Sequence, residues 1–213
     1  MIMFWDLDGP ILDVSKKYYE VYRDILLEHK EEPLSKKQYW ALKRSKVPVE
    51  ELLNRTNSQR IIKKFNSTWI EKIETKNYQK FDQLQRNTID VLTRCAEKNG
   101  LVIVTLRRNR NTLLAQLKDL GIIDYFIDIL SSGTSIQHNW HIKYNLITDY
   151  LKGKNKEKHI IIGDTEADIL AGKNLFFYTV AISNGIRSSK ILQRSNPDYI
   201  FSSISQYYNN CLL

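Results

Sequence analysis

Short, continuous apolar runs are the first pattern in this chain. Five of them, each rich in β-branched or aromatic residues, occur at 2–6, 101–105, 126–130, 159–163 and 177–182. Continuous runs of this length, without polar alternation, are typical of strands that are covered on both faces. We therefore predict five buried strands of one parallel sheet.

Helical patterns fill the intervals between most of these runs. They cover about residues 86–98, 110–119, 142–151 and 166–174. Gly121 stands where a helix-terminating glycine is expected. Strands that alternate with helices imply an α/β fold with a Rossmann-like, doubly wound parallel sheet.

One long segment, residues 15–82, breaks this alternation because it contains no convincing strand pattern. Apolar residues recur there at the i, i+3, i+4, i+7 and i+8 positions of a helix, as in Tyr18, Val21, Tyr22, Ile25 and Leu26. We predict that 15–82 is an inserted α-helical cap domain. The α/β core domain would then consist of 1–14 and 83–213.

Charge narrows the possible partners only a little. The chain has 213 residues with 32 basic and 24 acidic side chains, a net charge of +8, and the insert is more basic per residue than the rest. This balance fits a polyanionic partner, an anionic small substrate or a solvated, lysine-rich surface. The sequence contains no nucleic-acid-binding motif, so we expect no nucleic-acid partner.

Membrane and secretory classes are not favoured. The longest apolar runs are about five residues, far below the roughly 20 residues that a membrane-spanning helix needs. Asp6 and Asp8 directly follow the N-terminal apolar run, which is not typical of a secretory signal. Cys95 and Cys211 form no metal-type cluster and no disulfide framework. We expect a cytoplasmic monomer or homodimer.

Candidate chemistry lies at the carboxyl ends of the predicted strands, where open α/β sheets bind their ligands. The first strand ends in Asp6 and Asp8, and the second ends at Thr105. Asp164 follows the fourth strand, and Lys143 opens the helix before it. Asp168 comes one helical turn after Asp164. Carboxylates, one hydroxyl and one ammonium would therefore gather over one edge of the sheet.

These residues resemble the four motifs of the haloacid dehalogenase superfamily, in its phosphoglycolate-phosphatase-like branch. The segments that carry the resemblance are Asp6-Leu7-Asp8-Gly9, Thr105, Lys143 and Gly163-Asp164-Thr165-Glu166-Ala167-Asp168. The first and fourth motifs are specific, whereas the second and third are single residues. The helical insert sits where the cap domain of that family follows the first motif.

The resemblance implies a Mg²⁺-dependent phosphatase that acts on a small phosphorylated metabolite. Mg²⁺ prefers hard oxygen ligands, which Asp6 and Asp164 can supply, and Asp8 is also placed at the metal. The free oxygen of Asp6 can attack phosphorus and form an aspartyl-phosphate. Asp8 can protonate the leaving oxygen and then deprotonate water. Asp168 would support the metal or orient the lysine.

Phosphoryl oxygens would be held by Thr105, nearby amides and Lys143. Lys143 is followed by Tyr144 rather than by the usual proline, so other lysines compete for the third motif: Lys152, Lys154, Lys158 and Lys173. Pro10 stands where the family usually has Thr or Val. Because the amides expected at the phosphate belong to the two residues before Gly9, we expect activity to survive.

Three basic residues are candidates for substrate binding. Arg107 follows Thr105 in the second motif, whereas Arg44 and Lys46 lie in the insert and could face the site from the cap. Alternatively, each could simply lie on the surface.

Two other functions stay open. One is a phosphotransferase or mutase of the same superfamily, and the other is a non-catalytic protein that binds a phosphometabolite or polyanion. Asp8 separates a phosphatase from haloacid dehalogenase proper, which lacks a second aspartate there. The intact aspartates Asp6, Asp8 and Asp164 argue against a purely binding role.

Overall fold

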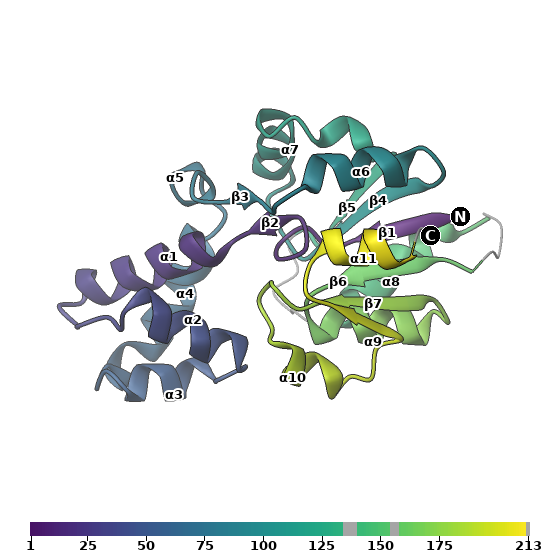
Figure 1. The fold of residues 1–213 in the computed structure, drawn as a ribbon. Helices are drawn as coiled ribbons and strands as arrows, with labels where there is room; N and C mark the ends of the chain where they lie inside the picture. The colour runs from purple at the N-terminus through teal and green to yellow at the C-terminus, as the bar shows by residue number, and fades with distance from the viewer. Residues whose placement is uncertain (134–139, 154–157, 212–213) are drawn as a thin grey trace.

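The computed structural model describes residues 1–133, 140–153 and 158–211. Figure 1 shows two lobes, one built around a β-sheet and a smaller one built only of helices. Within the described residues, no helix has the length and apolar character that crossing a bilayer requires.

The larger lobe contains a six-stranded sheet with the order β5-β4-β1-β6-β7-β8, and all neighbouring strands are parallel. The strands are β1 (Ile2–Trp5), β4 (Gly100–Thr105), β5 (Asp128–Ser131), β6 (Ile160–Gly163), β7 (Tyr178–Ile182) and β8 (Tyr199–Phe201). Five of them confirm the strands that the apolar runs predicted, and the α/β class with a doubly wound parallel sheet is confirmed.

Strand β1 lies inside the sheet, between β4 and β6, and its side chains are buried on both faces. Met3 and Trp5 join the hydrophobic cluster on one face, and Phe4 joins the cluster on the other. Met3 pairs with Leu101 of β4 and with Ile160 of β6. This register brings the carboxyl ends of the three strands to the same edge of the sheet.

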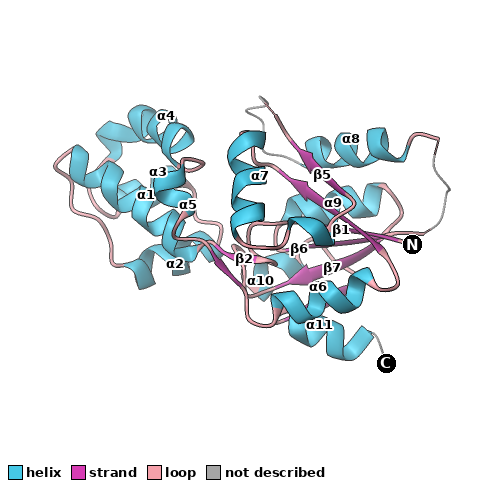
Figure 2. Cartoon of the chain, turned by 90° about the horizontal axis from the view of Figure 1, so that it is seen from above, coloured by secondary structure: helices cyan, strands magenta, loops and turns pink. Residues whose placement is uncertain are grey.

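Helices cover both faces of the sheet (Figure 2). One face packs against α6 (Thr88–Ala96), α7 (Arg110–Asp119) and α11 (Ile204–Cys211), and the other against α8 (Trp140–Leu151) and α9 (Glu166–Asn174). A short helix, α10 (Ser189–Gln193), packs near α9 and β7 through Leu192.

The smaller lobe, here called the cap, has its own apolar core, in which Tyr22 stacks on Tyr39 with ring centroids 4.5 Å apart. Its helices are α1 (Ser15–Glu28), α2 (Lys36–Arg44), α3 (Val49–Asn54), α4 (Ile62–Lys72) and α5 (Lys76–Gln79), with a 3₁₀ turn at Gln59–Ile61. They occupy the segment for which the sequence predicted a helical insert.

The cap joins the core through a two-stranded antiparallel ribbon. Its strands are β2 (Leu12–Asp13) and β3 (Gln83–Leu84), and Leu12 pairs with Leu84. The sequence prediction missed this ribbon because strands of two residues have no detectable periodicity. It also missed β8, a three-residue edge strand whose residues are half-buried or exposed, since the apolar-run criterion selects buried strands.

Candidate active site

The carboxyl edge of the sheet collects the side chains that the motifs predicted. Asp6 follows β1, Thr105 ends β4 and Asp164 follows β6. Lys143 reaches this edge from α8, and Asp168 reaches it from the first turn of α9. All five are buried, with Asp6 the most accessible at 6% exposed.

Lys143 is bound between two carboxylates. Its Nζ lies 2.9 Å from Asp6 Oδ1 and also pairs with Asp168 Oδ1. The other Asp168 oxygen accepts from Thr165, at 3.1 Å from the amide and 2.7 Å from the hydroxyl. Burial opposes the charge of Lys143, but Asp168 and Asp6 outweigh it and raise the pKa of the ammonium. Lys143 is therefore a fixed positive charge beside Asp6.

A third carboxylate, that of Asp164, lies close to the two that pair with Lys143. Oxygens of Asp6, Asp164 and Asp168 all lie within 4.8 Å of one another. Burial, and then the neighbouring Asp168, raise the pKa of Asp6 to about 7. Burial and the charges of Asp6 and Asp168 raise the pKa of Asp164 well above its usual range. Asp164 Oδ1 is buried, and no described residue forms a hydrogen bond with it. When its carboxyls are ionised, the cluster therefore has both excess negative charge and a free ligand oxygen.

Two glycines leave the space that Asp164 occupies. A Cβ added at Gly9 would lie 1.9 Å from Asp164 Oδ2, and one at Gly185 would lie 2.0 Å from the same atom. Gly9 also has a φ of +117°, which L side chains rarely adopt. The same Asp164 oxygen accepts from the amide of Ile186. The backbone thus fixes one oxygen of Asp164 and leaves Oδ1 without a partner of its own.

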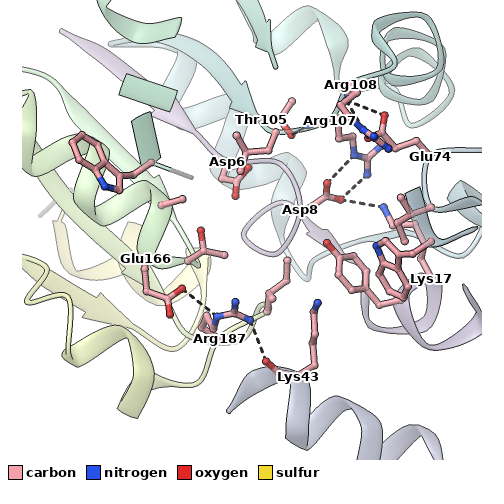
Figure 3. A pocket seen from close by; sticks show the side chains of 18 of the residues that line it. Asp6, Asp8, Lys17, Lys43, Glu74, Thr105, Arg107, Arg108, Glu166 and Arg187 are labelled. Atoms are coloured by element: carbon pink, nitrogen blue, oxygen red, sulfur yellow. Dashed lines mark hydrogen bonds and ion pairs between the residues drawn. The ribbon is translucent and has the colours of Figure 1, made fainter. Parts of the chain in front are cut away.

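The Asp8 carboxylate belongs to a separate group of charges, as Figure 3 shows. Arg107 donates to both of its oxygens, Nε to Oδ2 at 2.8 Å and Nη2 to Oδ1 at 2.6 Å. Lys17 donates to Asp8 Oδ1 at 3.2 Å. Burial would raise the pKa of Asp8, but Arg107 and Lys17 overcome this and hold it well below its usual range. Both side-chain oxygens of Asp8 thus already contact cations, and the role of Asp8 at the metal stays a prediction.

Asp82 completes this group. Its Oδ2 accepts from Lys17 Nζ at 2.8 Å and from Arg107 Nη2 at 3.0 Å, and from Gln116 Nε2 at 3.0 Å. Lys17 lies in the first turn of α1, where the chain enters the cap, and Asp82 directly precedes β3, where it returns. We call Asp8, Lys17, Asp82 and Arg107 the crossing cluster. It joins both cap connections to the first and second motifs.

A cavity of about 450 Å³ lies between cap and core above these groups. Asp6, Asp8 and Thr105 line it from the core, whereas Lys43 and Trp69 line it from the cap.

Polar contacts hold the two lobes together beside the cavity. The backbone amide of Arg108, on the core, donates to a carboxylate oxygen of Glu74 in the cap at 2.9 Å. Across the opening, Lys46 Nζ lies 2.9 Å from Glu166. Arg187 Nη1 donates to the carbonyl of Lys43 at 3.1 Å. In this structure the cap therefore covers the cavity.

The three predicted substrate-binding residues have different positions. Arg107 and Lys46 line the cavity, and both are paired with carboxylates. Arg44 does not line it: its Nη2 donates to the carbonyl of Ser183 at 2.5 Å, and its Nη1 to that of Asn184 at 3.3 Å. Arg44 thus holds the cap to the core rather than facing the site.

The other lysines considered for the third motif lie away from the carboxylate cluster, as far as the structure describes them. Lys152 pairs with Asp149 at 2.7 Å, Lys158 lies over the ring of Tyr178, and Lys173 lies in the last turn of α9. Lys154 lies outside the described residues. Only Lys143, among the lysines considered for the third motif in the described chain, contacts the carboxylate cluster.

Several site residues were missed by sequence reasoning. Lys17 and Asp82 are 65 positions apart and meet only through the ribbon. Lys43 and Arg187 come from the cap and from the loop after β7. On a helical projection of α2, Lys43 lies on the same face as the apolar Tyr39 and Trp40, whereas Arg44 does not. That projection would have selected Lys43. Only the position of the cap on the core shows which face of α2 meets the site.

Comparison with known proteins agrees with this geometry. The model of the haloacid dehalogenase-like hydrolase family matches residues 2–182. A phosphoglycolate phosphatase of Nitrosococcus oceani is 31% identical over 93 residues, 44% of this chain and 41% of that protein. The pyrophosphatase PpaX of Halalkalibacterium halodurans is 31% identical over 110 residues, 49% of this chain and 48% of that protein. The alignments thus span less than half the length of these curated relatives.

Solved structures match over nearly the full length. A haloacid dehalogenase-like hydrolase from Streptococcus pneumoniae has a TM-score of 0.79 at 24% identity, covering 98% of this chain and 96% of that one. A predicted phosphatase from Clostridium acetobutylicum has a TM-score of 0.77 at 15% identity, covering 99% and 97%. These likenesses show a shared fold. Because the family model spans the first motif, the cap and the fourth motif, the chain belongs to the haloacid dehalogenase-like hydrolase family.

Proposed function

We propose that this protein hydrolyses phosphate monoesters of small metabolites, with Mg²⁺ as cofactor and an aspartyl-phosphate on Asp6 as intermediate. The observation that carries the proposal is the position of Asp6. One of its oxygens pairs with Lys143, and it lines the cavity that the cap covers. It also lies beside Asp164, one of whose oxygens forms no hydrogen bond with a described residue. The similar proteins, a phosphoglycolate phosphatase and a pyrophosphatase, support a phosphorylated substrate.

The carboxylate cluster fits a divalent cation. Its oxygens are hard ligands, one of them is buried without a partner, and its negative charge exceeds that of the single ammonium. Asp6 and Asp164 would hold Mg²⁺, and Asp168 would act indirectly by orienting Lys143. When bound, the ion would neutralise charge on the phosphoryl group and on the cluster.

The chemistry then divides into two displacements. In the first, a carboxylate oxygen of Asp6 bonds to phosphorus, the bond to the leaving oxygen breaks, and Asp8 gives that oxygen a proton. In the second, Asp8 takes a proton from water, the water oxygen bonds to phosphorus, and the Asp6 carboxylate is released. Thr105 and Lys143 would hold the phosphoryl oxygens through both steps.

The crossing cluster bears on the first of these steps. Arg107 and Lys17 favour the ionised form of Asp8, which is the form that accepts the proton from water. To donate a proton to a leaving group, Asp8 must loosen at least one of these pairs. Lys17 and Asp82, at the two cap connections, take part in the same pairs, so we propose that cap movement changes the protonation state that Asp8 can hold.

The direct test is a phosphatase assay with p-nitrophenyl phosphate. Wild type is expected to turn it over with Mg²⁺ and to lose activity in excess EDTA. Asp6→Asn should lower kcat by roughly three orders of magnitude or more, because the amide is a poor nucleophile. Asp90→Asn, an exposed substitution on α6, serves as the control. Near wild-type turnover by Asp6→Asn would overturn the nucleophile assignment.

The metal assignment predicts a change in thermal stability. Mg²⁺ should raise the Tm of wild type by roughly 5 °C at saturation, since only the folded state holds the cluster together. Asp164→Asn should remove most of this shift, and without Mg²⁺ its Tm should equal or exceed that of wild type, because a buried repulsion is relieved. An equal Mg²⁺ shift in both proteins, measured by differential scanning calorimetry, would contradict Asp164 as a ligand.

The crossing cluster predicts a strong stability effect at Lys17. Among the described residues, Lys17→Met leaves Arg107 as the one cation paired with Asp8 and Asp82. The free energy of unfolding should therefore fall by about 2–4 kcal/mol. Lys16→Met changes the exposed neighbour on the same helix and should cost below about 1 kcal/mol. Urea denaturation of both variants measures the difference. Similar losses for the two would show that the buried pairs contribute little.

A further inference from the structure

The basic residues that line the cavity are nearly all paired with carboxylates. Arg107 and Lys17 pair with Asp8 and Asp82. The remaining pairs join Lys46 and Arg187 to Glu166, and Arg108 to Glu74.

Lys43 is the exception among the described residues that line the cavity. No carboxylate lies within ion-pair distance of its Nζ anywhere in the described chain. Instead the ammonium lies over two aromatic rings, 5.0 Å from the centroid of Tyr18 and 5.5 Å from that of Trp69. The side chain is half-buried, and such contacts offset only part of the cost of its partial removal from water.

The ammonium of Lys43 lacks a negatively charged partner among the described residues around it. Burial, and then the nearby Arg187, lower the pKa of Lys43 to about 8. Figure 3 shows its side chain rising from α2 into the cavity, opposite the core residues that carry the chemistry. An anion placed against this ammonium would stabilise its charged form and replace lost hydration.

The position of Lys43 also separates it from the phosphoryl end of the cavity. The phosphoryl group belongs beside Asp6 and Thr105 on the core, where Lys143 is already bound to two carboxylates. Lys43 lies on the opposite wall, which belongs to the cap. A cavity of about 450 Å³ has room for a metabolite that reaches both walls.

We propose that Lys43 is the binding site for a second anionic group on the substrate, carried by the leaving-group part of the ester. This rests on the proposed function above and names the substrate class: phosphate esters or anhydrides whose leaving group bears a carboxylate or another phosphate. Tyr18 and Trp69 hold the ammonium in place between substrate molecules. Lys46 and Arg187, which already share Glu166, contribute less to the second anion.

The test measures binding apart from turnover. In the Asp6→Asn background with Mg²⁺, isothermal titration calorimetry gives Kd values for three probes. These are 2-phosphoglycolate, which adds a carboxylate, pyrophosphate, which adds a phosphate, and ethyl phosphate, which adds no charge. Adding Lys43→Met should weaken 2-phosphoglycolate or pyrophosphate binding by at least about tenfold and ethyl phosphate binding by less than about threefold.

The two charged probes identify which anion the site takes. Loss for 2-phosphoglycolate alone assigns a carboxylate, loss for pyrophosphate alone assigns a phosphate, and loss for both assigns either anion. Lys43→Arg should keep most of the affinity because it keeps the charge. Lys37→Met, on the exposed face of α2, is the matched control and should leave all three Kd values near their starting values.

An equal change for all three probes in Lys43→Met would overturn the proposal, as would full affinity in that variant. Circular dichroism of each variant distinguishes this result from loss of the fold. Failure of the proposed function is a separate outcome, namely that wild type hydrolyses no ester with Mg²⁺. In that case a selective loss of anion affinity in Lys43→Met would still support Lys43 as an anion-binding site.

Discussion

The buried ion pairs of Lys143 are the constraint on which the rest of the site depends. A single ammonium lies between Asp6 and Asp168, and a third carboxylate, Asp164, lies beside them. Burial, and then the repulsion between carboxylates gathered this closely, raise the pKa values of Asp6 and Asp164. The sheet edge can hold this arrangement because strand order, glycine spacing and the Thr165 cap on Asp168 fix each side chain independently. The resulting excess of negative charge is what makes the place suitable for a cation, and a bound cation together with Lys143 would in turn attract a phosphoryl dianion.

A second set of charges links this chemistry to the cap. Asp8 is two residues from Asp6, yet its carboxylate belongs to the crossing cluster, with Lys17 from the cap entrance and Asp82 from its exit. Any movement of the cap about the β2–β3 ribbon must therefore disturb the partners of Asp8. The fold thus places the proposed nucleophile on the rigid sheet and the proposed acid–base group at the connection between the lobes. In the proposed mechanism, this division would let one cap both cover the substrate and influence proton transfer.

The sequence was sufficient to predict the position of a site residue where the open-sheet rule alone determines that position. Asp6, Thr105 and Asp164 end or follow buried parallel strands, so the open-sheet rule alone was enough to predict that they share one edge. It failed where a contact depends on docking of the cap. In the run Lys43-Arg44-Ser45-Lys46, successive helical residues point about 100° apart, so charge alone could not tell that Arg44 holds the core backbone while Lys43 enters the cavity. The pairing of Lys17 with Asp82 was likewise invisible, because the two-residue strands that bring them together carry no pattern.

Covalent phosphorylation of Asp6 is the step from which the rest of the proposed mechanism follows. To detect it, the enzyme is mixed with Mg²⁺ and a phosphate ester, the reaction is stopped with acid within a turnover, and the protein is reduced with borohydride. Reduction converts an acyl phosphate on aspartate to homoserine, which mass spectrometry locates in the sequence. We expect homoserine at position 6 in wild type and none in unreacted enzyme. Turnover without modification at position 6, or with modification at position 8 instead, would contradict the mechanism.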